Sequence, residues 1–161
     1  MGHRQSTIEL KNYCSDYKLI NPSHYTYRGS LNTPFPDEIG PSESGISVFT
    51  KTAGTFCRSV GVVTYDLLKN STEENQGKLA IMFSNPFDFN LYSNLFAVGV
   101  LDINTKCDYD LYTKMYYEAE GGYLRRAARD GGLTYTSERV TITATMTDTY
   151  EPDLRVQVHQ N

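Results

Sequence analysis

Three tyrosines at helical spacing are the first residues in this chain that suggest binding chemistry. They lie in residues 108–118, which contain no Gly or Pro, and they are Tyr109, Tyr112 and Tyr116. A helix places them on one face, with Leu111 and Met115 forming the adjacent apolar stripe. A tyrosine ring has an apolar body and a polar hydroxyl, which suits a partly hydrated site. The same row is also compatible with simple packing into a core, and the spacing alone leaves both interpretations open.

A second group of aromatic side chains lies in residues 83–96, whose sequence is FSNPFDFNLYSNLF. Asn, Ser, Asp and Pro favour turns, and Pro86 has no backbone N–H to donate. Apolar runs at residues 78–83 and 97–101 flank the segment and are typical of buried strands. An aromatic loop held between two strands is a candidate binding surface. The alternative is a loop whose apolar side chains fold back onto the core.

The remaining polar residues do not form a recognisable catalytic or metal-binding pattern. The spacing of Asp102, Asp108 and Asp110 does not fit a calcium-binding EF-hand loop, which also needs a central Gly and a terminal Glu. The three histidines are scattered along the chain. We therefore expect a protein that is not an enzyme and has neither a metal nor a cofactor. A basic cluster is read either as a solvated face or as a contact for acidic lipid headgroups or glycan carboxylates; it consists of Arg125, Arg126 and Arg129.

Composition narrows the class of protein further. A chain of 161 residues is expected to form a single domain, residues 1–161. Its net charge of −4 argues against a nucleic-acid partner bound through a basic surface. Three cysteines are too few for a disulfide scaffold and are expected to be reduced and mostly buried, although one oxidised pair stays open; they are Cys14, Cys57 and Cys107.

The sequence does not fix the location of the protein. Its first residues lack the pattern of a secretory signal, and no apolar run approaches the length of a membrane span. We expect a soluble protein that binds membranes peripherally, with export by a non-classical route left open.

Short alternating segments predict an all-β fold with one or two short helices. Ten strands are predicted, at residues 7–10, 17–20, 24–28, 46–51, 59–67, 78–83, 97–101, 133–136, 140–147 and 154–158. The second is expected to stop at Asn21 and Pro22, and residues 30–44 are expected to be a long loop. Strands of this number and length, with a single helix at 108–118, are typical of a β-sandwich.

These residues resemble the actinoporins, the pore-forming cytolysins of sea anemones, and their vertebrate actinoporin-like relatives. The sequence IMFSNPFDFNLYSNLF, residues 81–96, is similar to the signature loop of that family. Leu111-Tyr112-x-x-Met115-Tyr116-Tyr117 resembles its tyrosine-rich helix, and Val60-Gly61-Val62 before Tyr65 is a weaker match. The resemblance runs from about Ser6 to Val158, and the sandwich fold that it implies agrees with the predicted strands.

The resemblance implies a phosphocholine-binding site for sphingomyelin-containing membranes. The matching positions are Val60, Ser84, Pro86, Tyr92, Tyr112, Tyr116 and Tyr117. A quaternary ammonium has no hydrogen-bond donor, so aromatic faces hold it best. A cage of Tyr112 and Tyr116 facing Tyr92 is therefore expected, with the Ser84 hydroxyl donating to the phosphate. The membrane-contact loop is expected to present Phe89, Leu91, Leu95 and Phe96.

The chain departs from the family pattern in three places. Tryptophan is absent, and the Arg-Gly-Asp motif of several anemone members is missing near Gly121 and Arg129. Only Met1 to Gln5 precede the first predicted strand, so we expect this chain, as given, to lack the N-terminal amphipathic helix that forms the pore wall in that family. The expectation is a protein that binds phosphocholine membranes without perforating them.

A carbohydrate-binding lectin with the same sandwich is the alternative function. Fungal fruit-body lectins resemble the actinoporin fold, and sugar sites also use Tyr and Asn. The expected partners are thus membrane lipids or cell-surface glycans, with no nucleic acid and with a homo-oligomer left open.

Overall fold

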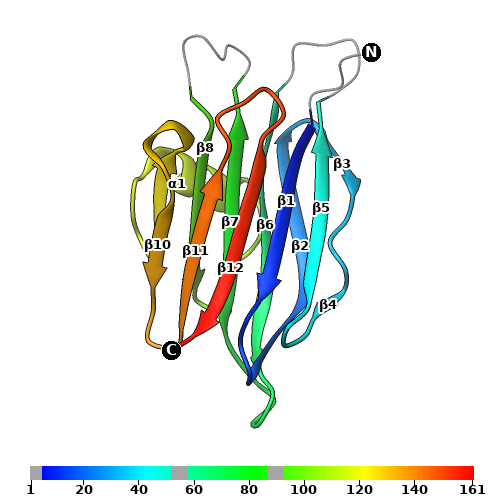
Figure 1. Cartoon of the computed structure of the whole chain (residues 1–161), viewed down its shortest axis with the longest axis vertical. Helices are drawn as coiled ribbons and strands as arrows, with labels where there is room; N and C mark the ends of the chain where they lie inside the picture. Colours follow the sequence, from blue (N-terminus) through cyan, green and yellow to red (C-terminus); the bar gives the residue numbers. More distant parts are fainter. Residues whose placement is uncertain (1–4, 52–57, 87–92) are drawn as a thin grey trace.

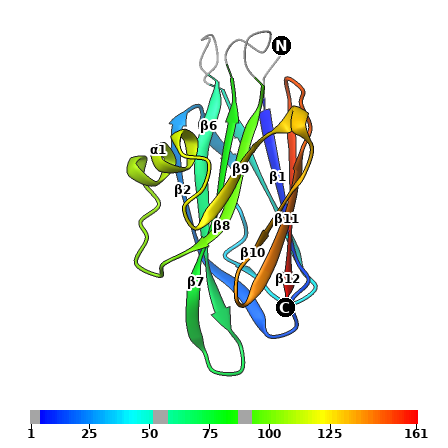
Figure 2. The ribbon, with the colours of Figure 1, turned by 90° about the vertical axis from the view of Figure 1, so that its left-hand side faces the viewer.

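Two six-stranded sheets pack face to face in the computed structural model, which describes residues 5–51, 58–86 and 93–161 (Figures 1 and 2). Sheet A has the strand order β10-β11-β12-β1-β5-β3, and sheet B has the order β4-β2-β6-β7-β8-β9. The strands of sheet A are β1 (Gln5–Asn12), β3 (Ser30–Thr33), β5 (Ser44–Thr50), β10 (Leu133–Thr136), β11 (Val140–Met146) and β12 (Asp153–Gln160). Those of sheet B are β2 (Tyr17–Arg28), β4 (Glu38–Ile39), β6 (Ser59–Lys69), β7 (Glu74–Asn85), β8 (Leu95–Leu101) and β9 (Tyr123–Ala127). The predicted β-sandwich is confirmed.

The main core lies between the sheets, and strand alternation produces it. Ile8 and Leu10 of β1 point inward, as do Val156 and Val158 of β12, while the residues between them face outward. β1 pairs with β12 in parallel and with β5 in antiparallel orientation. The alternating pattern of residues 7–10 predicts a strand but not its neighbours, and this pairing makes β1 an interior strand of sheet A.

The α-helix α1 (Tyr109–Tyr117) covers part of the outer face of sheet B (Figure 2). The Asp108 side chain caps it by accepting a hydrogen bond of 3.0 Å from the Leu111 backbone N–H. β6 is consequently buried on both faces from Ser59 to Leu67. A 3₁₀ helix at Ala128–Asp130 follows β9, so the expectation of one or two short helices is met.

Three sequence expectations about strand boundaries are wrong. β2 does not stop at Pro22, because a register shift between Ile20 and Ser23 absorbs the Asn-Pro pair, with Asn21 at a φ of 52°. The predicted loop at residues 30–44 contains the two short strands β3 and β4, which pair with β5 and β2 at the sheet edges. β9 is missing from the prediction because its sequence, YLRRA, carries two arginines and lacks an alternating apolar pattern.

The described cysteines are free. Cys14 is buried, Cys107 is partly buried, and Cys57 lies outside the described residues. Within residues 5–51, 58–86 and 93–161, no helix has the length and apolar character that crossing a membrane requires.

Candidate headgroup site

A row of four paired residues crosses sheet B near the C-terminal end of β7. Val60 of β6 pairs with Ser84 of β7, Ser84 with Leu95 of β8, and Leu95 with Ala127 of β9. Val60 and Ser84 are both buried. The antiparallel pairing of β6 with β7 thus places two of the predicted site residues, Val60 and Ser84, directly opposite each other.

Helix α1 lies over this row because its apolar stripe packs onto sheet B. Leu111 and Met115 are buried against Val62, Met82 and Ala97, as the helical spacing predicts. Burying such side chains contributes about 1.5–3 kcal/mol each, which holds the short helix on the sheet. The tyrosines on the neighbouring face therefore have a fixed position.

Two residues of β9, the strand that the sequence analysis does not detect, form hydrogen bonds to the C-terminal end of α1. The buried Tyr123 hydroxyl lies 2.8 Å from the Lys114 carbonyl oxygen and 3.1 Å from that of Glu118. The Arg125 guanidinium donates to the Tyr116 carbonyl oxygen. Both contacts satisfy carbonyl groups of the last helical turn, where a cation is also favoured by the helix dipole. β9 is thus part of the site's framework.

The tyrosine row forms, but its members differ in exposure. Tyr112 is only 3% exposed and its ring stacks on Tyr27 with centroids 5.2 Å apart. Tyr116 is partly buried, 5.6 Å from Tyr112 between ring centroids, and Tyr117 is 73% exposed. Tyr27 thus covers one face of Tyr112, which supports Tyr116, and the expected cage with Tyr92 stays a prediction because Tyr92 lies outside the described residues.

Two tyrosines of β2 extend this row and are missed by the sequence analysis. Tyr25 and Tyr27 alternate along β2 on the outer face of sheet B, and both contact Tyr109. The Arg28 guanidinium lies 4.4 Å from the centre of the Tyr27 ring. The alternating sequence HYTYR holds the signal, because residues two apart on a strand share a face.

A pocket of about 190 Å³ opens beside Tyr116, at the end of the tyrosine row. Ser84, Pro86 and Tyr116 line it, so it joins three of the predicted site residues from two segments. The other lining residues come from β8, β9 and the segments beside them; they are Ser93, Leu95, Ala127 and Arg129. Arg129 belongs to the basic cluster of the sequence analysis, and its inclusion favours the interpretation of that cluster as an anion contact.

Arginines lie around the site, although the chain is acidic overall. Arg129 is exposed at the pocket, and Arg28 and Arg58 lie along the tyrosine row. Burial raises the pKa of the Tyr112 hydroxyl and Arg58 lowers it by a smaller amount, so Tyr112 stays neutral. The Asp148 carboxylate accepts hydrogen bonds from the hydroxyl of the lining residue Ser93 at 3.0 Å and from the Asn94 backbone N–H at 3.2 Å.

Two of the four predicted membrane-contact residues, Leu95 and Phe96, lie within the described part of the chain. Phe96 is fully buried between the sheets, because it occupies an inward position of β8, so its assignment to a membrane contact is wrong. Leu95 is partly buried at the pocket. Phe89, Leu91 and Tyr92 lie outside the described residues, and the predicted cage partner Tyr92 stays a prediction.

Comparison with known proteins identifies the family. The family model described as sea anemone cytotoxic protein matches residues 5–159. DELTA-alicitoxin-Pse1b of Phyllodiscus semoni is 34% identical over 93 residues, which cover 57% of this chain and 38% of that protein. Bryoporin of Physcomitrium patens is 28% identical over 118 residues, which cover 73% of this chain and 63% of that protein. The chain therefore belongs to the sea anemone cytotoxic protein family and is actinoporin-like.

Solved structures show the same fold at low sequence identity. The lipid binding protein Nakanori superposes with a TM-score of 0.72 at 12% identity, covering 100% of this chain and 72% of that one. The Xerocomus chrysenteron lectin XCL gives a TM-score of 0.53 at 10% identity, with 99% and 100% covered. The sandwich is thus shared by a lipid-binding protein and a lectin.

Proposed function

We propose that this protein is a non-enzymatic membrane-recognition module that binds phosphocholine headgroups of sphingomyelin-containing membranes. One observation carries the proposal: a pocket joins Ser84, Pro86 and Tyr116 with Arg129, at the end of a fixed tyrosine row. The volume of about 190 Å³ suits a headgroup and is too small for whole acyl chains. Family membership supports the same conclusion.

The two charges of phosphocholine have complementary surroundings in this arrangement. The Arg129 guanidinium and the Ser84 hydroxyl are donors suited to the phosphate. The rings of Tyr116 and the exposed Tyr117 meet edge to face with centroids 4.8 Å apart, and their free faces suit the quaternary ammonium. Tyr112 supports Tyr116 from behind.

Binding by this chain is proposed to leave vesicles sealed. β1 is hydrogen-bonded to β12 on one side and β5 on the other. Releasing it into a bilayer would break two ladders and expose unpaired backbone groups to hydrocarbon. Dye-loaded sphingomyelin vesicles should therefore retain their dye at concentrations where the protein is fully bound.

Flotation with sphingomyelin vesicles tests the headgroup site. Tyr116→Ala and Arg129→Gln should each weaken binding by about 1–2 kcal/mol, the scale of one aromatic face or one charge-assisted hydrogen bond. Arg139→Gln is the matched control, because Arg139 is exposed in the turn before β11, away from the pocket. Soluble phosphocholine should compete with the vesicles, and choline or phosphate alone should compete less well. If phosphocholine shows no saturable binding to the wild type, the proposal fails.

A further inference from the structure

The outer face of sheet A carries polar side chains on β11 and β12. β11 has Val140, Ile142 and Ala144 pointing inward and threonines at the positions between them. α1 lies on the sheet B side, and in Figure 2 no helix covers the described strands β10, β11 and β12. A row of hydroxyl groups is therefore accessible to a ligand on this face.

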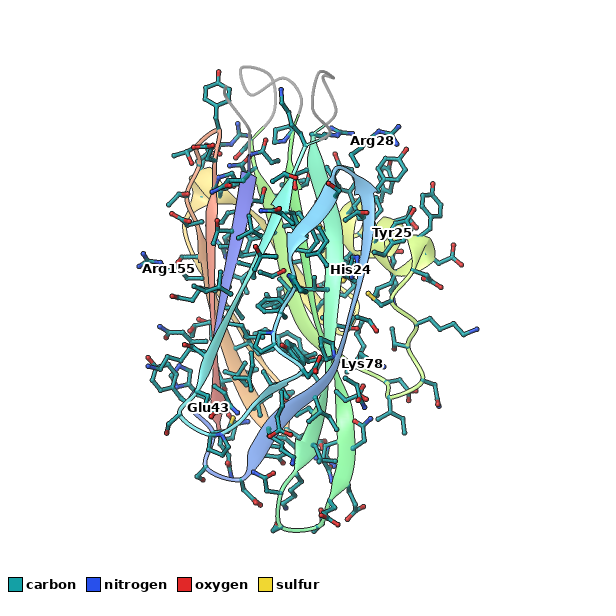
Figure 3. The ribbon with its side chains drawn as sticks, turned by 90° about the vertical axis from the view of Figure 1, so that its right-hand side faces the viewer. His24, Tyr25, Arg28, Glu43, Lys78 and Arg155 are labelled. Carbon is teal, nitrogen blue, oxygen red and sulfur yellow. The ribbon has the colours of Figure 1, made fainter. Side chains whose placement is uncertain are left out.

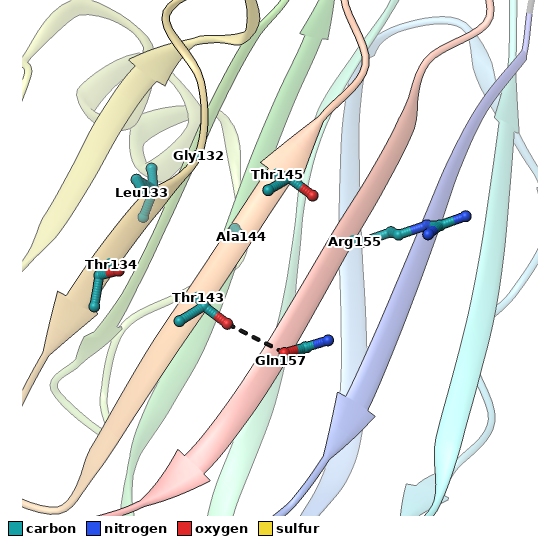
Figure 4. Close-up of a pocket in the computed structure, with 8 residues that line it drawn as sticks. All are labelled: Gly132, Leu133, Thr134, Thr143, Ala144, Thr145, Arg155 and Gln157. Carbon is teal, nitrogen blue, oxygen red and sulfur yellow. Dashed lines mark hydrogen bonds between the residues drawn. The ribbon is translucent and has the colours of Figure 1, made fainter.

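The strand register assembles these polar side chains into two rows. Thr134 of β10 pairs with Thr143 of β11, and Thr143 pairs with Gln157 of β12. In the next row Thr145 pairs with Arg155. The Thr143 hydroxyl lies 3.4 Å from the Gln157 amide oxygen, which Figure 4 shows as a dashed line. The five side chains thus converge on one stretch of three strands.

A shallow groove of about 390 Å³ lies among them (Figure 4). Gly132 and Ala144 contribute its small lining residues beside Leu133. A Cβ on Gly132 would lie 2.9 Å from the Thr145 methyl carbon and 3.0 Å from the Ala144 carbonyl oxygen. The missing side chain lets the start of β10 lie tightly against β11 and leaves the space above it open.

Arg155 gives the groove its charge. It is exposed, points away from the sheet in Figure 3, and forms no ion pair within the described part of the chain. No carboxylate lines the groove. The nearest ones in the register are Glu9, opposite Arg155 on β1, and Asp153, two residues earlier on β12. The guanidinium is therefore free to bind an anion, with Glu9 as a weak competitor.

We propose that this groove binds a saccharide that carries a carboxylate. Threonine hydroxyls both donate and accept hydrogen bonds, and the Gln157 amide does the same, which matches neighbouring sugar hydroxyls. The planar guanidinium fits a carboxylate through two parallel hydrogen bonds. Its place on the outer face of sheet A separates the groove from the headgroup site on sheet B.

An aromatic platform one row along the sheet extends this surface. Tyr13 and His159 stack in parallel with ring centroids 4.9 Å apart. His159 follows Gln157 on the same face of β12 and pairs with Thr141. His159 covers one face of the half-exposed Tyr13 ring, and the Lys11 ammonium lies 5.2 Å from the ring centre, so the pair borders this surface and adds a cation to it.

Titration of the whole chain with 3′-sialyllactose and with lactose tests the proposal, because the two sugars differ by one carboxylate-bearing unit. The wild type should bind sialyllactose in the millimolar range or better, about tenfold more tightly than lactose. Arg155→Gln should remove this preference, and Thr143→Val with Gln157→Ala should weaken both sugars. Glu9→Gln should strengthen sialyllactose binding slightly, because it removes a competing negative charge.

Tyr116→Ala serves as the control for the other site, since it should weaken sphingomyelin vesicles and leave sialyllactose unchanged. The proposal is overturned if neither sugar binds up to about ten millimolar, if Arg155→Gln leaves the preference intact, or if Tyr116→Ala abolishes sugar binding. Failure of the headgroup site alone would leave sialyllactose binding to the wild type in place, so the two failures are distinguishable.

Discussion

The two outer faces of the sandwich are built from the same kind of strand and serve different purposes. On sheet B, α1 covers Val60, Val62 and Met82, and tyrosines surround its edge. On sheet A, threonines occupy the equivalent outward positions of β11 and remain in contact with solvent. The difference shows that the outward residues of a strand match their surroundings. They are apolar where a helix packs on the sheet and polar where the sheet faces solvent.

Removing apolar volume beneath α1 should have the largest effect and tests this comparison directly. Met115→Ala should lower the free energy of unfolding by about 2–5 kcal/mol, because Met115 is fully buried and leaves a cavity. Thr143→Ala on the opposite face should change it by no more than about 0.5 kcal/mol. Urea unfolding of the two variants measures both values. Equal losses would contradict the assignment of sheet B as the covered face.

The fastening of α1 by β9 gives the second prediction. Tyr123→Phe should cost about 1–2 kcal/mol, because it removes the hydroxyl that serves two carbonyl groups at the end of the helix. Tyr135→Phe is the control: its hydroxyl is 3.4 Å from the Val100 carbonyl oxygen, a longer contact. Thermal unfolding should separate the variants, and Tyr123→Phe should also weaken phosphocholine binding. A larger loss from Tyr135→Phe would be inconsistent with this fastening.

The helix cap is expected to contribute less. Asp108→Ala should cost about 1 kcal/mol by removing the acceptor for the Leu111 N–H. Asp110→Asn, in the same first turn without a capping bond, should cost only a few tenths, roughly 0.3 kcal/mol. Chemical unfolding of both variants checks the ratio, which should be well above one if α1 depends on its cap.

The smallest effect at neutral pH comes from Tyr112→Phe and grows in alkali. Burial raises the folded-state pKa of Tyr112 above its ordinary value of 10.0, so its stabilising effect is complete below pH 10 and is lost as the pH rises further. Stability of the wild type should therefore fall above pH 10, and Tyr112→Phe should reduce that fall. Unfolding curves between pH 8 and 11 measure the difference. If the free energy of unfolding of the variant falls with pH as steeply as that of the wild type, the ionisation of Tyr112 is not linked to unfolding.

Much of the framework is predictable from local patterns. The alternation in VTITATM and LRVQV identifies β11 and β12, and the spacing of Leu111 and Met115 identifies the buried stripe of α1. These signals are strong because each residue's environment follows from its neighbours two, three or four positions away. β9 and the short edge strand β4 lack such a signal, since YLRRA carries two arginines without apolar alternation and β4 is only two residues long.

The site is only partly predictable for the same reason. Sequence resemblance identifies Ser84, Pro86 and Tyr116, which the pocket brings together, but it does not reveal that Tyr27 stacks on Tyr112, and it gives the buried Phe96 a surface position. Tyr112 is covered by Tyr27, which lies 85 positions earlier in the chain. Phe96 faces inward because β8 begins at Leu95, two residues before the predicted start at residue 97, and its alternation therefore includes Phe96.

The sequence by itself determined the β-sandwich, the helix with its inward stripe, and the family. Tertiary structure decided which rings stay exposed, that Arg129 joins the headgroup pocket, and that Thr143, Gln157 and Arg155 share a groove. The physical reason is that alternation and helical spacing fix which way a side chain points, whereas its neighbours depend on strand register and sheet order. Those are set by contacts between segments that are far apart along the chain.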